Sequence, residues 1–170
     1  QARLERGERI SNIVLMGMGE PLLNFPQVER ALRILGDERG ASFSPRRITL
    51  STVGHVPGIQ KLAAAGLNVN LAGSLSATTD EVRDQIMPIN RRWPIAELLK
   101  ACRDYPLPNR RRLTFEYVML DRVNDSQQDA KRLVGLLRGI RCKLNLIPFN
   151  AAPDLPDKPS PRKRVEGFQQ

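Results

Sequence analysis

Short apolar runs and amphipathic stretches alternate along most of the chain. A short run that is bounded by glycine or rich in β-branched residues indicates a strand, whereas apolar residues three and four positions apart indicate a helix. The pattern predicts strands at 12–18, 46–51, 68–75, 112–120 and 142–149, and helices at 25–39, 57–65, 95–102 and 126–137. The sequence TTDE at 78–81 predicts a capping box, which opens a further helix that ends before Pro88.

Five strands that alternate with helices predict an α/β fold with parallel strands joined by right-handed crossovers. A segment of an α/β barrel and an open doubly wound sheet both fit this order, and periodicity does not choose between them. Beyond Asn150 the sequence is rich in proline and charge and has no helical or strand period. Residues 151–170 are therefore predicted to be a Pro-rich basic tail or loop after a unit formed by residues 1–150.

The carboxyl ends of the strands are where parallel α/β folds gather their ligand-binding groups. The first predicted strand ends in Gly17-x-Gly19, but Leu22 stands where a dinucleotide fingerprint has its third glycine, and no Walker lysine follows. The remaining candidate is Glu20, which lies between Gly19 and Pro21. A carboxylate fixed there can hold an ammonium group, although a tight turn with a solvated glutamate has the same sequence.

Composition restricts the class of protein further. The chain has 170 residues, of which 41% are hydrophobic and 26% charged, which excludes disorder and describes one ordinary domain. No long apolar run is present, and Cys102 and Cys142 lie far apart, which excludes a membrane span, a secretory signal and a disulfide scaffold. We therefore expect a cytoplasmic protein. The net charge of +9 fits an acidic partner such as RNA, DNA or an anionic cofactor. Because the chain opens on Gln1, we expect it to be a piece of a longer protein.

Five sequence stretches carry a family resemblance. They are MGMGEPLLN (16–24), RRITLSTVG (46–54), SLSATTDEVRDQIMPINRR (74–92), EYVMLDRVND (116–125) and KLNLIPFN (143–150). In this order they resemble the radical S-adenosylmethionine (SAM) RNA methyltransferases that methylate C2 of an adenosine in 23S rRNA and in certain tRNAs. The resemblance covers residues 12–150. Gly-Glu-Pro is common to many radical SAM enzymes, whereas MGMGEPLLN together with PIN and EYVML is specific to this family and its antibiotic-resistance relatives.

The resemblance implies a partial (β/α)₆ barrel of the radical SAM type with SAM bound across its carboxyl-end mouth. Gly19 and Glu20 would contact the methionine end of SAM, with the Glu20 carboxylate facing the ammonium group. The other SAM contacts that the resemblance implies are Ser51, Ser74, Leu75, Ser76 and Asn150. Ser76 stands where the family usually has histidine, so a backbone contact and not an imidazole contact is expected there.

The resemblance also implies a [4Fe-4S] cluster whose ligands lie outside this chain. The cluster cysteines form a CxxxCxxC loop that would lie upstream of residue 1, and the two cysteines of methyl transfer would also lie outside. Cys102 and Cys142 are expected to be small core residues. No catalytic residue and no metal ligand is therefore predicted within the segment, which we expect to be inactive alone. The family activity implies 23S rRNA, tRNA and a one-electron reductant as partners, with no membrane, and we expect a monomer.

Other activities remain open from the sequence. Another radical SAM enzyme, such as a glycyl-radical activating enzyme, would share Gly-Glu-Pro, and C8 methylation of the same adenosine would share most of the segment. A basic α/β module that binds nucleic acid without chemistry is the alternative from a different class. It predicts RNA affinity that depends steeply on salt and no SAM affinity.

Several further residues have a structural and a functional interpretation. The arginine groups at 46–47 and 110–112 precede strands, which places them on the face opposite the SAM mouth, whereas Arg91 and Arg92 are better candidates for RNA contact. The basic group at 162–164 is expected to be a flexible part of the tail. His55 is predicted to be a loop residue, and Met16 and Met18 to pack in the core. Glu116 lies on one face of its strand with Thr114 and Val118, and alternation does not decide whether that face is the inner one.

Overall fold

One sheet of five parallel strands organises the computed structural model, which describes residues 10–151 and 156–169. The strands are β1 (Ile13–Leu15), β2 (Ile48–Thr52), β3 (Asn70–Ser74), β4 (Leu113–Met119) and β5 (Cys142–Pro148). They lie side by side in the order of the sequence. A doubly wound sheet would reverse its strand order at a switch point, whereas a barrel wall continues in one direction. The predicted partial barrel is therefore confirmed.

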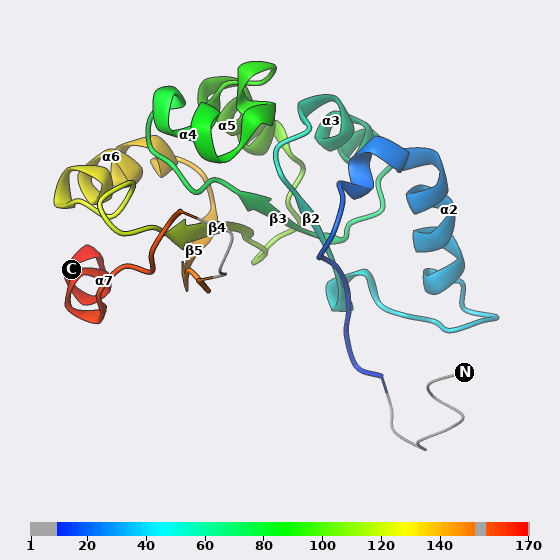
Figure 1. Cartoon of the computed structure of the whole chain (residues 1–170). Coiled ribbons are helices and arrows are strands. Elements are labelled where there is room, and N and C mark those ends of the chain that lie inside the picture. Colours follow the sequence, from blue (N-terminus) through cyan, green and yellow to red (C-terminus); the bar gives the residue numbers. More distant parts are fainter. Residues whose placement is uncertain (1–9, 152–155, 170) are drawn as a thin grey trace.

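Helices α2 to α6 cover one face of the sheet, and α7 lies beyond α6 at the end where β5 forms the edge (Figure 1). The helices are α2 (Phe25–Gly36), α3 (Val56–Ala64), α4 (Asp80–Ile86), α5 (Ile95–Asp104), α6 (Gln127–Leu137) and α7 (Arg162–Phe168). Short 3₁₀ helices η1 (Pro21–Asn24), η2 (Pro45–Arg47) and η3 (Pro88–Arg91) join some of these elements. All the predicted strands and helices are present, with ends shifted by a few residues.

The hydrophobic core lies between the sheet and the helices. Leu50 of β2 and Phe115 of β4 are buried with Leu98 of α5. Successive side chains of a strand point to opposite faces, so the alternation of buried and half-buried residues along β4 shows which face meets the helices. Glu116 belongs to the half-buried set. It lies on the face that α2 to α6 leave uncovered, which answers the question that the sequence leaves open.

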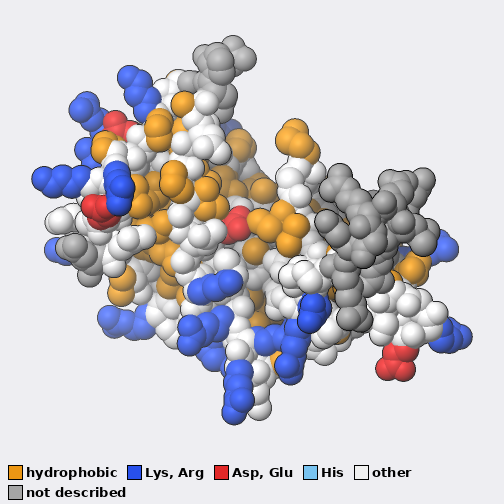
Figure 2. Space-filling view, turned by 90° about the horizontal axis from the view of Figure 1, so that it is seen from below, with side chains coloured by type: hydrophobic (Ala, Val, Ile, Leu, Met, Phe, Trp, Pro, Cys, Tyr) orange, Lys and Arg blue, Asp and Glu red, His pale blue; other side chains and the backbone are white. Residues whose placement is uncertain are grey.

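Polar side chains form rows across this open face of the sheet. Residues that pair across parallel strands point to the same side. One row is Ser51, Ala72, Thr114 and Lys143, in which only Ala72 is apolar, and the next is Ser74, Glu116 and Asn145. Figure 2 looks onto the molecule from this side and shows hydrophobic side chains in its central part, with lysine and arginine side chains toward its margin.

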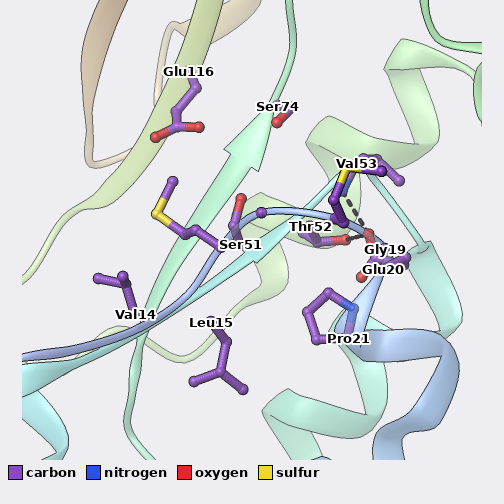
Figure 3. A pocket seen from close by; sticks show the side chains of 13 residues that line it. Val14, Leu15, Gly19, Glu20, Pro21, Ser51, Thr52, Val53, Ser74 and Glu116 are labelled. Atoms are coloured by element: carbon purple, nitrogen blue, oxygen red, sulfur yellow. Dashed lines mark hydrogen bonds between the residues drawn. The ribbon is translucent and has the colours of Figure 1, made fainter.

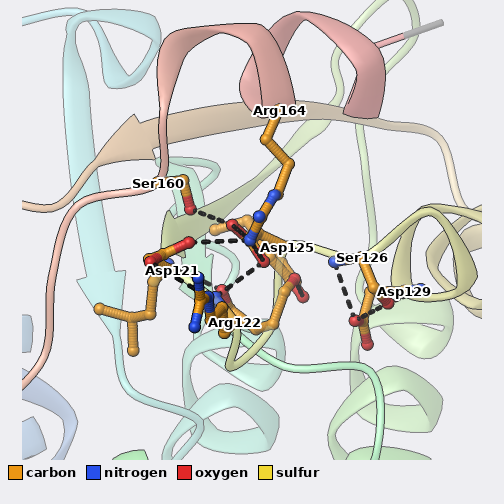
Figure 4. Close-up of polar contacts among 10 residues, drawn as sticks. Asp121, Arg122, Asp125, Ser126, Asp129, Ser160 and Arg164 are labelled. Atoms are coloured by element: carbon orange, nitrogen blue, oxygen red, sulfur yellow. Dashed lines mark hydrogen bonds and ion pairs between the residues drawn. The ribbon is translucent and has the colours of Figure 1, made fainter.

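The C-terminal segment differs from the prediction. Residues 151–170 are predicted to be a tail or loop, but residues 162–168 form helix α7. The Phe168 ring packs 5.5 Å from that of Tyr117 in β4. Arg164 Nη1 donates to Asp121 at 2.8 Å and to Asp125 at 3.0 Å (Figure 4). Tertiary contacts hold this helix, and a seven-residue segment with two separated anchors has no periodicity that a sequence pattern can detect.

Two smaller details complete the fold. The residue that caps α4 is Thr79, whose hydroxyl accepts from the backbone N–H of Val82, and not Thr78, the first residue of the predicted capping box. Thr78 is buried and donates instead to Asp129 of α6 at 2.6 Å. Among the described residues, no helix has the length and apolar character needed to cross a membrane.

Candidate functional site

A cavity of about 510 Å³ lies at the carboxyl ends of β1, β2 and β3, beside the middle of β4, on the open face of the sheet. Its wall comes from the end of β1 and the loop that follows, from the ends of β2 and β3, and from the middle of β4 (Figure 3). Of the predicted contacts, four line this cavity: Gly19, Glu20, Ser51 and Ser74. Its volume is in the range of pockets for small molecules and cofactors.

Two glycines shape the loop that forms one wall of the cavity. Gly17 has φ +132° and Gly19 has φ +88°. Residues with a side chain rarely adopt these backbone angles, although a Cβ on either residue would meet no atom within 4 Å. The requirement for glycine is therefore one of backbone conformation and not of space.

Glu20 connects this loop to the end of β2. Its Oε1 accepts from the N–H of Leu22 at 2.9 Å, and its Oε2 accepts from Thr52 Oγ1 at 3.0 Å and from the N–H of Val53 at 2.7 Å. A carboxylate has about four lone-pair sites, so three protein donors occupy most of its capacity. The side chain of Glu20 caps η1 and holds the loop against β2, which gives it a structural role beside any contact with a ligand.

Ser51 and Ser74 present their hydroxyl groups to the cavity from neighbouring strands. Both residues are half-buried, and neither hydroxyl forms a hydrogen bond with the described residues. Each hydroxyl can donate one hydrogen bond and accept others. The two side chains are therefore available to a bound molecule.

Glu116 is a cavity residue that sequence reasoning did not assign to the site. The signal was present in the motif EYVML and in the alternation of β4, but only the register of β4 beside β3 places Glu116 next to Ser74. Its carboxylate faces the cavity from the side opposite Glu20 (Figure 3). Among the described residues, no hydrogen bond or ion pair engages this carboxylate.

Leu75 and Ser76 lie behind the cavity wall and are buried. Ser76 has φ +51°, and its hydroxyl accepts from the N–H of Val118 at 3.3 Å while its carbonyl accepts from Asn124. Asn150 is exposed beyond β5 and does not line the cavity. The structure therefore brings four of the seven predicted contacts together and leaves these three outside the cavity.

A buried arginine fixes the strand ends that carry the site. Arg83 of α4 is 0% exposed, and its guanidinium donates to the carbonyls of Val53, Ser74 and Leu75 at 2.9 to 3.0 Å. It also donates to Asn90, whose amide nitrogen donates to two aspartates of α4, Asp80 and Asp84. Burial lowers the pKa of Arg83 to about 10, which leaves it charged at neutral pH. The cation thus binds the ends of β2 and β3 together.

The sequence predicts that Met16 and Met18 pack in the core, and this prediction is wrong. Met16 is 44% exposed and Met18 is fully exposed, and both line the cavity. The apolar run that predicts a buried strand ends at Leu15, because the chain leaves the sheet there. The thioether side chains therefore form an apolar rim on the cavity.

His55 lies just before α3, close to Glu20 and Trp93. Its ring meets that of Trp93 edge to face with centroids 4.7 Å apart, and its Nδ1 is buried without a hydrogen-bond partner among the described residues. Burial lowers the pKa of His55, and the nearby charge of Glu20 opposes this shift. Its position in the loop before α3 agrees with the sequence prediction.

The two cysteines and Arg92 have contacts that packing explains. Cys102 is buried in α5, and burial raises the pKa of its thiol to about 12, which disfavours the thiolate that binds metals. The pKa of Cys142 is also raised by burial. No group of three or more His, Cys, Asp or Glu side chains suited to a metal ion occurs in residues 10–151 and 156–169. Arg92 packs over the Trp93 ring at 4.9 Å.

Comparison with known proteins agrees with this architecture. The radical SAM superfamily model matches residues 1–134. The chain is 52% identical over 170 residues to the dual-specificity RNA methyltransferase RlmN of Syntrophus aciditrophicus, covering 100% of this chain and 49% of that protein. It is 58% identical over 160 residues to the protein of the same name from Jannaschia sp., covering 94% and 41%. The chain spans about half the length of the curated relatives it matches or less.

Solved structures agree with the sequence comparisons. A radical SAM methyltransferase from Sphaerobacter thermophilus superposes with a TM-score of 0.93 at 47% identity, covering 99% of this chain and 50% of that one. A domain of a pyruvate-formate lyase-activating enzyme from Bacteroides vulgatus superposes with a TM-score of 0.67 at 13% identity, covering 94% and 91%, which shows a shared fold alone. The chain therefore belongs to the radical SAM superfamily.

Proposed function

We propose that this chain is the SAM-holding segment of a radical SAM RNA methyltransferase that methylates C2 of an adenosine in 23S rRNA and in some tRNAs. The observation that carries the proposal is the cavity at the carboxyl ends of β1, β2 and β3, with a glycine-shaped loop on one wall and free serine hydroxyls on the other. The names of the proteins that are 52% and 58% identical to this chain over the matched residues support the choice of substrate.

The residues of the cavity fit SAM. Gly19 and Glu20 would contact the methionine end, with the Glu20 carboxylate facing the ammonium group, while the hydroxyls of Ser51 and Ser74 would bind polar groups of the ligand. Leu75 and Ser76 would act through the backbone that follows β3, since their side chains are buried. Asn150 is the seventh proposed contact, from the loop after β5. Three protein donors on the Glu20 carboxylate hold the loop in place for these contacts.

Within residues 10–151 and 156–169, no set of side chains forms a site for an iron–sulfur cluster. Cys102 is buried and Cys142 is half-buried, and neither belongs to a group of possible metal ligands among the described residues. We therefore place the ligands of the [4Fe-4S] cluster in a part of the protein outside this chain. When bound, SAM and the cluster supply the radical chemistry and the methyl group that adenine C2, which is not nucleophilic, requires. The contribution of this segment is to bind SAM, orient it and exclude water from one side of it. A one-electron reductant, a cytoplasmic location and a monomeric state belong to the same proposal.

The test uses the full-length protein that carries this segment, with its cluster reconstituted. Incubation with SAM, a reductant and unmodified 23S rRNA should give 2-methyladenosine, detected by mass spectrometry of the digested RNA. Ser51→Ala should weaken SAM binding by roughly 3- to 10-fold, which corresponds to one hydrogen bond of about 1 kcal/mol. Glu81→Gln, an exposed change on α4, is the control. Formation of 8-methyladenosine would contradict the proposed position, and no SAM binding would contradict the proposal as a whole.

A further inference from the structure

Six arginines gather at the amino ends of the strands, opposite the cavity. Arg46 and Arg47 directly precede β2, residues 110–112 directly precede β4, and Arg141 directly precedes β5. Parallel strands begin at the same edge of a sheet, so these residues share one end of the molecule. We call them the amino-end arginine cluster. Figure 2, which looks onto the open face of the sheet, shows lysine and arginine side chains together along its lower margin.

Hydrogen bonds connect the loops that carry this cluster. Arg47 Nη1 donates to the carbonyl of Ser11, ahead of β1, at 3.1 Å. Arg111 donates to the carbonyl of Asn68, ahead of β3. Burial and the nearby charge of Arg46 lower the pKa of Arg111, which shows that cations of different loops lie close together. The cluster is therefore one continuous surface across the amino ends of the sheet.

No acid balances this surface among the described residues. All six arginines are absent from the ion pairs of the described chain, and five of them are exposed. Asp104 at the end of α5, the acid nearest in sequence to residues 110–112, pairs with Lys100 at 2.7 Å. Like charges without counterions repel one another, so a bound polyanion would stabilise this end of the molecule.

We infer that the amino-end arginine cluster binds the phosphate backbone of RNA. Guanidinium groups suit this partner, because their planar fork of donors matches the oxygens of a phosphate. The inference rests on the proposed function, since it takes the bound RNA to be the substrate. It adds a second RNA surface to the one that the sequence predicts at Arg91 and Arg92.

One RNA molecule can reach both the cluster and the cavity. The longest strands have seven residues, which span about 23 Å at the usual rise of a strand. A nucleic acid strand with one phosphate per roughly 3.4 Å covers this length with about seven phosphates. A folded RNA whose adenosine lies at the cavity can therefore place its backbone beside the amino ends of the strands.

The test removes three charges from the cluster and three from elsewhere. Arg46→Gln, Arg110→Gln and Arg112→Gln are combined in the full-length protein, because these side chains form no hydrogen bond or ion pair with the described residues. The control combines Arg33→Gln, Lys100→Gln and Arg162→Gln, which removes the same charge from exposed positions of α2, α5 and α7.

Fluorescence anisotropy with a 23S rRNA fragment that contains the target adenosine gives RNA affinity as a function of salt. The cluster variant should bind about tenfold more weakly or worse at 100 mM salt, and the slope of log affinity against log salt should fall in magnitude by about 2 to 3. The control variant should keep the wild-type slope. SAM affinity and the thermal midpoint should stay unchanged in both variants, because the mutated residues do not line the cavity.

Two results would overturn the inference. An unchanged RNA affinity and salt slope in the cluster variant would show that this surface does not contact RNA, and a fall of the thermal midpoint with that result would assign it to contacts within the protein. An equal loss in the control variant would show that net charge and not the cluster is responsible. Wild type that binds RNA through the cluster but forms no 2-methyladenosine would contradict the proposed function alone.

Discussion

At the scale of single residues, the two acids of the cavity show that position in a motif and chemical role are different properties. The sequence identifies Glu20 through its place between Gly19 and Pro21, and the structure places it at the cavity. Its oxygens, however, are directed to the backbone of Leu22 and Val53. Of the two carboxylates, the one without a protein partner among the described residues is that of Glu116 in β4. It faces the cavity because the helices cover the opposite face of the sheet.

Replacement of Glu20 by glutamine should destabilise the protein. An amide has one acceptor oxygen, so its nitrogen would face an N–H donor from either Leu22 or Val53. The expected loss is about 1–3 kcal/mol in the free energy of unfolding, measured by denaturant titration. Glu81→Gln is the control that changes the same chemical group on an exposed helix position. A Glu20→Gln variant as stable as wild type would show that these hydrogen bonds contribute nothing.

The pKa of His55 should lie below its ordinary value of 6.5 because its ring is partly buried. The unfolded chain then binds a proton at a higher pH than the folded chain does. The contribution to stability is present above pH 6.5 and is lost as the pH falls below this value. His55 is the only histidine, so its ring signals in an NMR titration report the pKa without ambiguity. A pKa at or above 6.5 would contradict the prediction.

At the scale of elements, helix α4 acts on the site without contacting the cavity. Arg83 reaches from α4 to the carbonyls at the ends of β2 and β3. The sequence predicts the helix from its cap and the proline that follows. It does not predict that a charged residue of this helix is buried, because arginine is mostly a surface residue.

Replacement of Arg83 by methionine should cost roughly 3 kcal/mol or more, since it removes a buried cation and leaves its acceptors without donors. The free energy of unfolding is again the measurement. Arg91→Met, in the exposed part of η3, removes the same type of side chain and should change it little. Equal stabilities for the two variants would show that the buried network is not needed for folding.

At the scale of the whole molecule, the sheet has one face covered by helices and one face lined with polar rows. The chain spans about half the length of its relatives or less. The described lysine and arginine side chains are mostly exposed, and none of them lines the cavity. In the proposed function, SAM binding and RNA binding would therefore use different groups, which allows them to be separated by experiment.

Salt should separate the enzyme from a basic module that only binds nucleic acid. In the full-length protein, RNA affinity should fall by more than about tenfold between 50 and 200 mM salt, because phosphate contacts release counterions. SAM affinity at the cavity should change by less than about twofold over the same range. RNA binding together with no SAM binding at any salt concentration would favour the non-catalytic module.

The sequence by itself determined the strands, the helices and the loop after the first strand, because local periodicity, proline and glycine report local conformation. The motifs around Glu20, Ser51 and Ser74 also identified most of the cavity. Only the tertiary structure decided between a barrel and a doubly wound sheet, since strand order depends on contacts between distant segments. The tertiary structure likewise decided which residues of β4 lie on the open face of the sheet, that Arg83 is buried and that α7 forms. Each of these depends on partners that lie far away in the sequence.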